Sequence, residues 1–324
     1  MKETGLSRRE FVAVALAGMP LAVTMRPRSL AARGSFTVGV TTSSLRELPR
    51  VTGKDNVDDV LRALRVVGAT HVDLALANIE PAPPSVAPFV GGSAAYPRRV
   101  ILSAEEILST NREARAGLRE WRMNGASAAT FERVRSQFAA AGITVNACSI
   151  GYDRSFDDDE IDATFRQVKS LGVNVISSPL TMETASRLVP FAQRHKMSIA
   201  VHNDVDGNAG GQIATADIPT VLALSPVFSL KLDVGNLTAS NCDAVAELRT
   251  VRARVSHVVL KDRLRSGGKS LPFGEGDTPI QGVLRLLETF TPAIPAFVEY
   301  DYAGLRPAAD EITESLRYVA QHAS

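Results

Sequence analysis

The feature of this 324-residue chain that most constrains its fold is a regular alternation between short apolar runs and amphipathic stretches. Apolar runs of strand length recur from residue 36 onward, and the stretches between them carry apolar side chains at helical spacing. This alternation predicts repeated βα units with parallel strands. The eight expected strands are 36–41, 70–76, 143–149, 173–177, 198–202, 227–233, 255–261 and 296–300. The expected helices include 57–67, 104–123, 131–141, 161–171, 183–195 and 279–290.

Eight strands separated by helices favour a closed barrel over an open doubly wound sheet. An open sheet that binds nucleotides carries a GxGxxG or GxxxxGK[ST] motif after its first strand, and neither motif follows residue 41. The sequence therefore predicts an α/β protein with one domain, a (β/α)8 TIM barrel over residues 35–324.

One connection in this pattern is irregular. Residues 78–102 are rich in proline and glycine and form a loop too long to be a plain connector. The loop leaves the carboxyl end of the second expected strand, where barrel enzymes build their active sites. We therefore expect it to act as a lid.

The N-terminus predicts export. Arg8 and Arg9 precede an apolar run over residues 11–23, and a small-x-small cleavage pattern follows at 29–31. Residues 7–12, Ser-Arg-Arg-Glu-Phe-Val, closely resemble the twin-arginine export motif. We expect a signal peptide over residues 1–32, a periplasmic protein and no stable membrane insertion once the signal is removed. An ordinary secretory signal or an uncleaved anchor is the alternative.

The charge and cysteine content exclude several classes of partner. The 36 Lys and Arg residues against 35 Asp and Glu residues give a formal net charge of +1, so no basic surface indicates nucleic acid as a partner. Cys148 and Cys242 are the two cysteines of the chain, which excludes a disulfide framework and a CxxC metal motif.

Polar side chains gather where the expected strands end. Active sites of such barrels lie at the carboxyl ends of the strands, and strand alternation decides which side chains point inward. Both rules together select one group of side chains. On strands it contains Asp73, His202, Asp204, Asp233, Lys261 and Glu299, and on the loops that follow strands it contains Asn236 and Glu275.

Four of these strand-end segments resemble a known superfamily. They are Leu-Asp-Val-Gly-Asn at 232–236, Leu-Lys-Asp-Arg at 260–263, Phe-Gly-Glu-Gly-Asp-Thr-Pro-Ile at 273–280 and Phe-Val-Glu-Tyr-Asp-Tyr at 297–302. They look like the motifs of the xylose isomerase-like sugar phosphate isomerase/epimerase superfamily, in particular its exported members with twin-arginine signals. The resemblance implies a barrel that holds a divalent metal with carboxylates and histidines and acts on sugars.

The resemblance places Asp233 and Glu299 at two metal-ligand positions, but histidines of the family are missing. They fall on Asp204, Asn236 and Val259, and the strand-four end at 175–179 has no glutamate. Two alternatives follow. Asp204, Asp233 and Glu299, with His202, hold a metal ion, for which their oxygen atoms favour Mn²⁺ or Mg²⁺ over Zn²⁺. In the other alternative the metal is lost and the acidic groups bind sugar hydroxyls.

The predicted function is that of an isomerase, epimerase or related lyase that removes a proton next to a carbonyl of a small carbohydrate or keto-sugar. Glu299, Asp233 and Lys261 are the expected catalytic residues, although Lys261 could instead be a structural partner of a carboxylate. His202, Asn236, Glu275 and Asp73 are expected to bind the substrate, while His257 is expected to be a core residue. The alternative is a carbohydrate-binding or catalytically silent barrel with a degenerate metal site.

Overall fold

The computed structural model describes residues 35–83, 104–206, 211–304 and 306–323. The predicted signal peptide and most of the predicted loop at 78–102 lie outside the described residues, so both the signal and the lid stay predictions.

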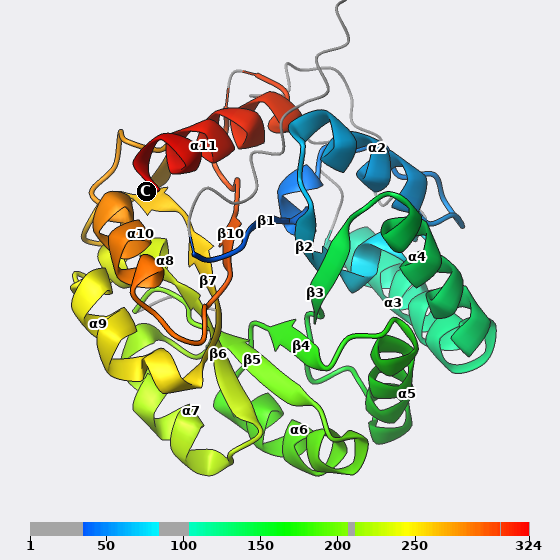
Figure 1. The fold of residues 1–324 in the computed structure, drawn as a ribbon. Coiled ribbons are helices and arrows are strands. Elements are labelled where there is room, and N and C mark those ends of the chain that lie inside the picture. The colour runs from blue at the N-terminus through cyan, green and yellow to red at the C-terminus, as the bar shows by residue number, and fades with distance from the viewer. Residues whose placement is uncertain (1–34, 84–103, 207–210, 305, 324) are drawn as a thin grey trace, which may run out of the picture.

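Eight parallel strands close into a barrel, which confirms the predicted (β/α)8 TIM fold (Figure 1). Their order around the barrel is β1-β10-β7-β6-β5-β4-β3-β2. Each strand begins and ends within two residues of its expected run. The strands are β1 (Val38–Thr41), β2 (His71–Ala75), β3 (Thr144–Ser149), β4 (Val175–Ser178), β5 (Ser198–His202), β6 (Phe228–Asp233), β7 (Val255–Leu260) and β10 (Ala296–Val298). A separate antiparallel pair, β8 (Asp262–Arg263) and β9 (Ser270–Leu271), follows β7.

Helices surround the strands as an outer ring (Figure 1). They are α2 (Val57–Val67), α3 (Ala104–Glu120), α4 (Ala128–Ala140), α5 (Asp158–Ser170), α6 (Met182–His195), α7 (Ile218–Leu224), α8 (Val234–Ala239), α9 (Ala244–Val251), α10 (Ile280–Glu288) and α11 (Ala308–His322). Short 3₁₀ turns lie at Thr42–Leu45, Leu76–Asn78, Thr215–Asp217 and Arg252–Arg254. No described helix has the length and apolar character needed to cross a membrane.

The helix after the long loop departs from its expected form. Instead of one α-helix to Met123, α3 ends at Glu120 and a π-helical turn, η3 (Trp121–Gly125), follows. Arg122 is the buried residue of this turn. Its Nε donates to Glu80 Oε1 at 2.6 Å and its Nη1 to Glu160 Oε1 at 2.7 Å. The wide turn thus directs one arginine into a buried ion-pair network between η3, α5 and the segment after β2.

Strand alternation divides the side chains between two environments. On β6, Leu230 and Leu232 belong to the apolar core, whereas Lys231 and Asp233 point into the barrel and contact side chains from other strands. The same alternation turns His257 and Lys261 inward on and just after β7. Polar residues therefore fill the carboxyl half of the barrel interior.

Candidate active site

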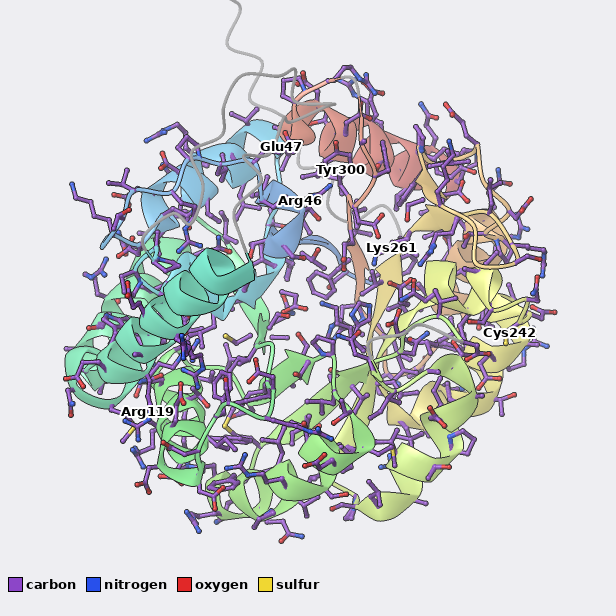
Figure 2. All side chains as sticks on the ribbon, turned by 180° about the vertical axis from the view of Figure 1, so that it is seen from behind. Arg46, Glu47, Arg119, Cys242, Lys261 and Tyr300 are labelled. Carbon is purple, nitrogen blue, oxygen red and sulfur yellow. The ribbon has the colours of Figure 1, made fainter. Side chains whose placement is uncertain are left out.

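Five charged or titratable side chains meet at the carboxyl end of the barrel, and we call them the mouth cluster: His202, Asp233, Lys261, Glu299 and Asp301. The Lys261 Nζ lies 3.0 Å from Asp233 Oδ2, 3.1 Å from Glu299 Oε1 and 3.2 Å from Asp301 Oδ2. One ammonium group thus forms ion pairs with three carboxylates. Figure 2 shows Lys261 inside the ring of helices.

The local chain geometry fixes Asp233 and Lys261. Asp233 ends β6 and is also the N-cap of α8, where its Oδ1 accepts a hydrogen bond from the Asn236 N–H at 2.9 Å. Its Oδ2 lies 3.0 Å from His202 Nε2. A Cβ atom on Gly235 would stand 2.6 Å from Lys261 Cβ, so only glycine lets the first turn of α8 lie against this lysine.

A second polar group, the lower cluster, lies deeper in the barrel and consists of Asp73, Ser177, Lys231 and His257. Lys231 Nζ contacts Asp73 Oδ2 at 2.7 Å, and Ser177 Oγ donates to the same oxygen at 2.9 Å. His257 Nε2 lies 3.6 Å from it, just beyond hydrogen-bond distance. Lys231 precedes Asp233 by two residues on β6, which places it about 6–7 Å further from the mouth. All four residues are buried.

Three residues of the mouth cluster, Lys261, Glu299 and Asp233, are held in their charged forms. Burial alone would lower the pKa of Lys261, but Asp233, Glu299 and Asp301 raise this pKa well above its usual value. Burial alone would raise the pKa of Glu299, and the Lys261 and Lys231 ammonium groups hold it below its usual value instead. The pKa of Asp233 is lowered in the same way by Lys261 and His202. At neutral pH the site therefore presents a protonated lysine beside ionised carboxylates.

The lower cluster contains an ion pair and a neutral imidazole. Despite burial, Lys231 and His257 hold the pKa of Asp73 below its usual value. Asp73 and Glu299 in turn raise the pKa of Lys231 against the effect of burial. Burial lowers the pKa of His257, and this effect outweighs the attraction of Asp73. His257 is thus uncharged at neutral pH.

These lowered carboxyl pKa values predict a specific loss of stability in acid. A carboxyl group whose pKa is lower in the folded state stabilises the fold above its unfolded pKa, about 3.9 for Asp, and this stabilisation is lost as the pH falls toward the folded pKa. We expect the free energy of unfolding to fall below about pH 4 by up to about 1.4 kcal/mol per pH unit for each such group. Urea denaturation between about pH 2 and 5 measures this slope.

The Asp73→Asn variant should show a shallower acid slope than the wild type. Val60→Ala is the matched control, because Val60 is fully buried and carries no titratable group. It should lose stability by about the same amount at every pH. A wild-type slope in Asp73→Asn would contradict the assignment of Asp73.

Each of the two clusters contains one buried side-chain atom that has no hydrogen-bond partner among the described residues. Glu299 Oε2 and His257 Nε2 are buried atoms without a hydrogen bond. The Glu299 side chain is 13% exposed, so the residue reaches the solvent side of the cluster while this oxygen does not. A buried carboxylate oxygen without a donor is available to accept a proton or a hydrogen bond from a bound molecule.

The structure brings four predicted site residues together, namely His202, Asp233, Lys261 and Glu299, and places the others elsewhere. Asp73 lies in the lower cluster. Asn236 donates from Nδ2 to Asn203 O at 2.8 Å and accepts from Arg263 Nη1 at 2.6 Å, so its amide is engaged in the scaffold.

Glu275 and its loop have a structural explanation. The Asp262 carboxylate accepts hydrogen bonds from the backbone N–H groups of Gly274, Gly276 and Thr278, at 2.7–3.1 Å. The loop thus wraps around a buried anion, and a Cβ on Gly276 would stand 2.2 Å from Asp262 Oδ1. Glu275 itself is exposed. Within the described residues, no contact joins its side chain to the mouth cluster.

The sequence assigned no role in the site to Lys231, Ser177 or Asp301, although strand alternation places Asp301 on the same face as Glu299. The signal for Lys231 was present, because Lys231 and Asp233 are two residues apart on one strand and must share the inward face. Asp301 follows Glu299 at the same spacing. Ser177 carries no such signal, because its role depends on the position of Asp73 across the barrel.

One group of described side chains could hold a metal ion. His202, Asp233 and Glu299 each offer one ligand atom, and these atoms all lie within 4.8 Å of one another. Asp204, a predicted ligand, is not in this group, and its backbone forms a bridge with Ala214 beyond the end of β5. Without Asp204 the set is one imidazole and two carboxylates, so the expected preference for Mn²⁺ or Mg²⁺ over Zn²⁺ loses its basis.

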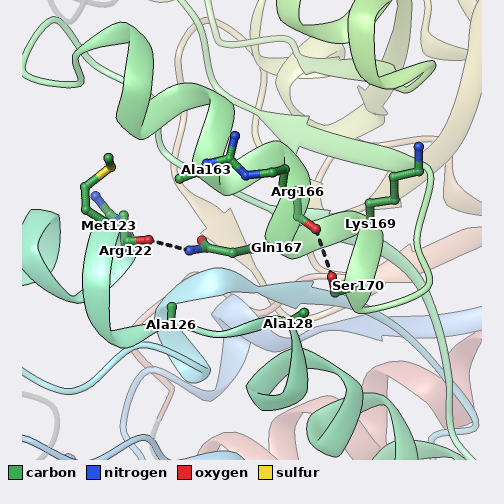
Figure 3. Close-up of a pocket in the computed structure, with 9 residues that line it drawn as sticks. All are labelled: Arg122, Met123, Ala126, Ala128, Ala163, Arg166, Gln167, Lys169 and Ser170. Carbon is green, nitrogen blue, oxygen red and sulfur yellow. Dashed lines mark hydrogen bonds between the residues drawn. The ribbon is translucent and has the colours of Figure 1, made fainter.

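Two of the larger cavities in the described part of the chain lie outside the mouth cluster. One of about 510 Å³ lies between η3 and α5 (Figure 3), where Gln167 Nε2 donates to Arg122 O at 2.7 Å. Its lining has no carboxylate or histidine, so it offers no group for proton transfer near neutral pH. The other, of about 670 Å³, lies between the loops that follow β3, β4 and β5, with Arg154, Thr181 and Gln212 in its wall. It opens at the carboxyl end of the barrel, the same end as the mouth cluster.

The closed barrel of eight parallel strands is a (β/α)8 TIM barrel, and solved structures share this fold. A xylose isomerase domain protein from Planctomyces limnophilus has a TM-score of 0.57 at 13% identity, over 81% of this chain and 91% of its own. The probable 3-DHS dehydratase AsbF from Bacillus anthracis has a TM-score of 0.56 at 12% identity, over 86% and 97%. The IolI protein with a bound zinc atom has a TM-score of 0.56 at 11% identity, over 88% and 97%.

At these identities the structural likeness establishes the fold alone. No family model and no curated protein matches the sequence.

Proposed function

We propose that the protein is an enzyme that removes a proton next to a carbonyl group of a small carbohydrate or keto-sugar, and so acts as an isomerase, an epimerase or a related lyase. The observation that carries this proposal is the pairing of Glu299 with Lys261. Glu299 Oε2 is buried without a hydrogen-bond partner, while Oε1 lies 3.1 Å from the lysine ammonium. The names of the structural neighbours, which include an isomerase domain and a dehydratase, agree with this reaction class.

Each group has a defined part in the proposed reaction. Glu299 Oε2 takes the proton from the carbon next to the carbonyl, and the electron pair of the broken C–H bond forms the C=C bond of an enediolate. The carbonyl oxygen receives the negative charge, which the Lys261 ammonium stabilises. Return of the proton to the former carbonyl carbon, with the hydroxyl proton passing to the other oxygen, gives the isomer. Protonation of the original carbon by water from its opposite face, while Glu299 releases its proton to solvent, gives the epimer. In the lyase reaction, the enediolate reforms the carbonyl and expels the hydroxyl group on the carbon beyond the deprotonated one, and this group leaves as water with the proton that Glu299 had taken.

The electrostatics favour Glu299 over Lys261 as the base. Because the pKa of Lys261 is raised, its amine carries no free lone pair at neutral pH. The same argument disfavours a covalent Schiff base on Lys261 or Lys231, since an amine nucleophile needs a lowered pKa. Asp301 is the contact of Lys261 that a substrate oxygen would displace, because its side chain is 31% exposed and its distance is the longest of the three.

A divalent metal meets the distance requirement but not the electrostatic one. His202, Asp233 and Glu299 would be its ligands. The Lys261 ammonium already contacts both carboxylates and would face the ion with like charge. The arrangement therefore does not fit the metal that the fold family implies, and no step of the proposed reaction needs one.

Deuterium exchange tests the function directly. The full chain is incubated in D₂O with a panel of aldoses, ketoses and keto-sugars, and NMR follows exchange at the carbon next to each carbonyl. We expect one substrate class to exchange and to form an isomer, an epimer or a dehydrated product. Saturable binding without exchange would instead establish the carbohydrate-binding barrel. Because the N-terminus predicts export, we further propose that these substrates are met in the periplasm.

A further inference from the structure

Every negative group of the mouth cluster is arranged around one cation, Lys261. Asp233 ends β6, while Glu299 and Asp301 follow β10, and these two strands flank β7, which Lys261 follows. Each of the three carboxylates contacts the same Nζ at 3.0–3.2 Å. The Lys261 side chain is 6% exposed. A single buried ammonium thus takes the central position among these carboxylates.

Apart from Glu299 Oε2, which has no hydrogen-bond partner among the described residues, the carboxylate oxygens that could bind a metal are already engaged. Asp233 Oδ1 accepts from the Asn236 N–H, and Asp233 Oδ2 contacts both His202 Nε2 and Lys261 Nζ. Glu299 Oε1 contacts Lys261 as well. An ion bound to Asp233 Oδ2 at the usual distance of about 2.1 Å would stand within about 5 Å of the ammonium. A metal ion and the Lys261 ammonium would therefore compete for the same carboxylate oxygens.

The surrounding strands supply no replacement ligand within the described residues. Val259, which shares the inward face with Lys261 and precedes it by two residues, has no ligand atom in its side chain, and Ser177 is bound to Asp73. The amide of Asn236 is engaged with Asn203 and Arg263. These three residues leave any metal with His202, Asp233 and Glu299 alone.

We propose that the Lys261 ammonium is the resident cation of this site and takes the electrostatic role of a divalent metal, so that the wild-type protein does not bind one. The inference rests on the proposed function only for the role of the ammonium beside the substrate carbonyl. Its consequence for metal binding is independent of that function. Removal of the ammonium should convert the three remaining side chains into a metal site.

Isothermal titration with Mn²⁺ and, separately, Zn²⁺ tests the inference in the wild type and in Lys261→Met, with metal content measured after dialysis. We expect no saturable binding by the wild type up to about 1 mM and, in the variant, about one equivalent bound at least about tenfold more tightly. In Lys261→Arg, which keeps the cation, the metal should again fail to bind. A wild-type protein that binds one equivalent tightly, and loses it in Glu299→Gln, would overturn the inference.

A charge-balanced variant covers the case in which Lys261→Met does not fold. Lys261→Met with Asp301→Asn removes one cation and one carboxylate and leaves His202, Asp233 and Glu299 intact. It should also gain one bound metal ion, and a folded double variant that gains none would contradict the inference. Deuterium exchange by wild-type protein after chelator treatment separates the two proposals. A protein that binds no metal and exchanges no substrate would uphold the resident lysine while refuting the proposed function.

Discussion

Replacing Glu299 by glutamine is expected to lower kcat for deuterium exchange by about 10³-fold, because glutamine keeps the shape of the side chain but cannot take the proton. This loss corresponds to about 4 kcal/mol of activation free energy. KM should change little, since the amide can still accept hydrogen bonds from substrate hydroxyls. Initial rates of exchange with the best substrate of the panel measure the effect.

Asp301→Asn is the matched control for this prediction. Asp301 contacts the same ammonium as Glu299, but its side chain is partly exposed and lies at the longest distance. Its removal should lower kcat less than about tenfold, as expected for a partly solvated ion pair. Equal losses in the two variants would show that Glu299 acts only as a counterion of Lys261, and an active Glu299→Gln would exclude it as the base.

Lys231→Met is expected to lower the free energy of unfolding by about 3–5 kcal/mol. Asp73 is 1% exposed and Lys231 is 3% exposed, so the substitution leaves a carboxylate buried without its counterion. Ser177 continues to donate to Asp73 but supplies no charge. Urea denaturation at pH 7 measures the loss.

Two further variants separate burial from charge in this prediction. Asp73→Asn combined with Lys231→Met removes both charges and should recover at least about 2 kcal/mol of the loss. Arg62→Met removes an exposed ion pair with Asp59 on α2 and should cost no more than about 1 kcal/mol. A double variant as unstable as Lys231→Met would mean that the methionine side chain itself does not fit.

The barrel could be predicted because its determinants are local. Each strand is a short apolar run between helical patterns, and β5 has the same bounds in the prediction and the structure. The switch from α3 to the π-helical η3 was not predictable, since it depends on the buried contacts of Arg122 with Glu80 and Glu160. Those partners are remote in the sequence and carry no periodic signal.

The sequence could predict which side chains each strand contributes to the site, but not which of these side chains contact one another. Strand ends and alternation identified Asp233, Lys261 and Glu299, because each follows from its own strand. The pairing of Asp73 with Lys231 crosses the barrel and depends on the stagger between strands, which one sequence does not reveal. Asp204 is not part of the group that could hold a metal, for another reason. The chain leaves the barrel after His202, and the backbone of Asp204 pairs with that of Ala214.

The ion pair between Glu80 and Arg122 has a consequence for how this protein can change over time. These residues flank the long connection between β2 and β3, and their contact of 2.6 Å brings its two ends to one buried point. Residues 81–121 therefore form a loop that this ion pair closes. Each doubling in the length of such a loop raises the entropic cost of its closure by only about 0.6 kcal/mol. Insertions and deletions between Glu80 and Arg122 are therefore expected to be tolerated while the strands keep their register. The length of this one segment can thus change over time without any change to the strands of the barrel.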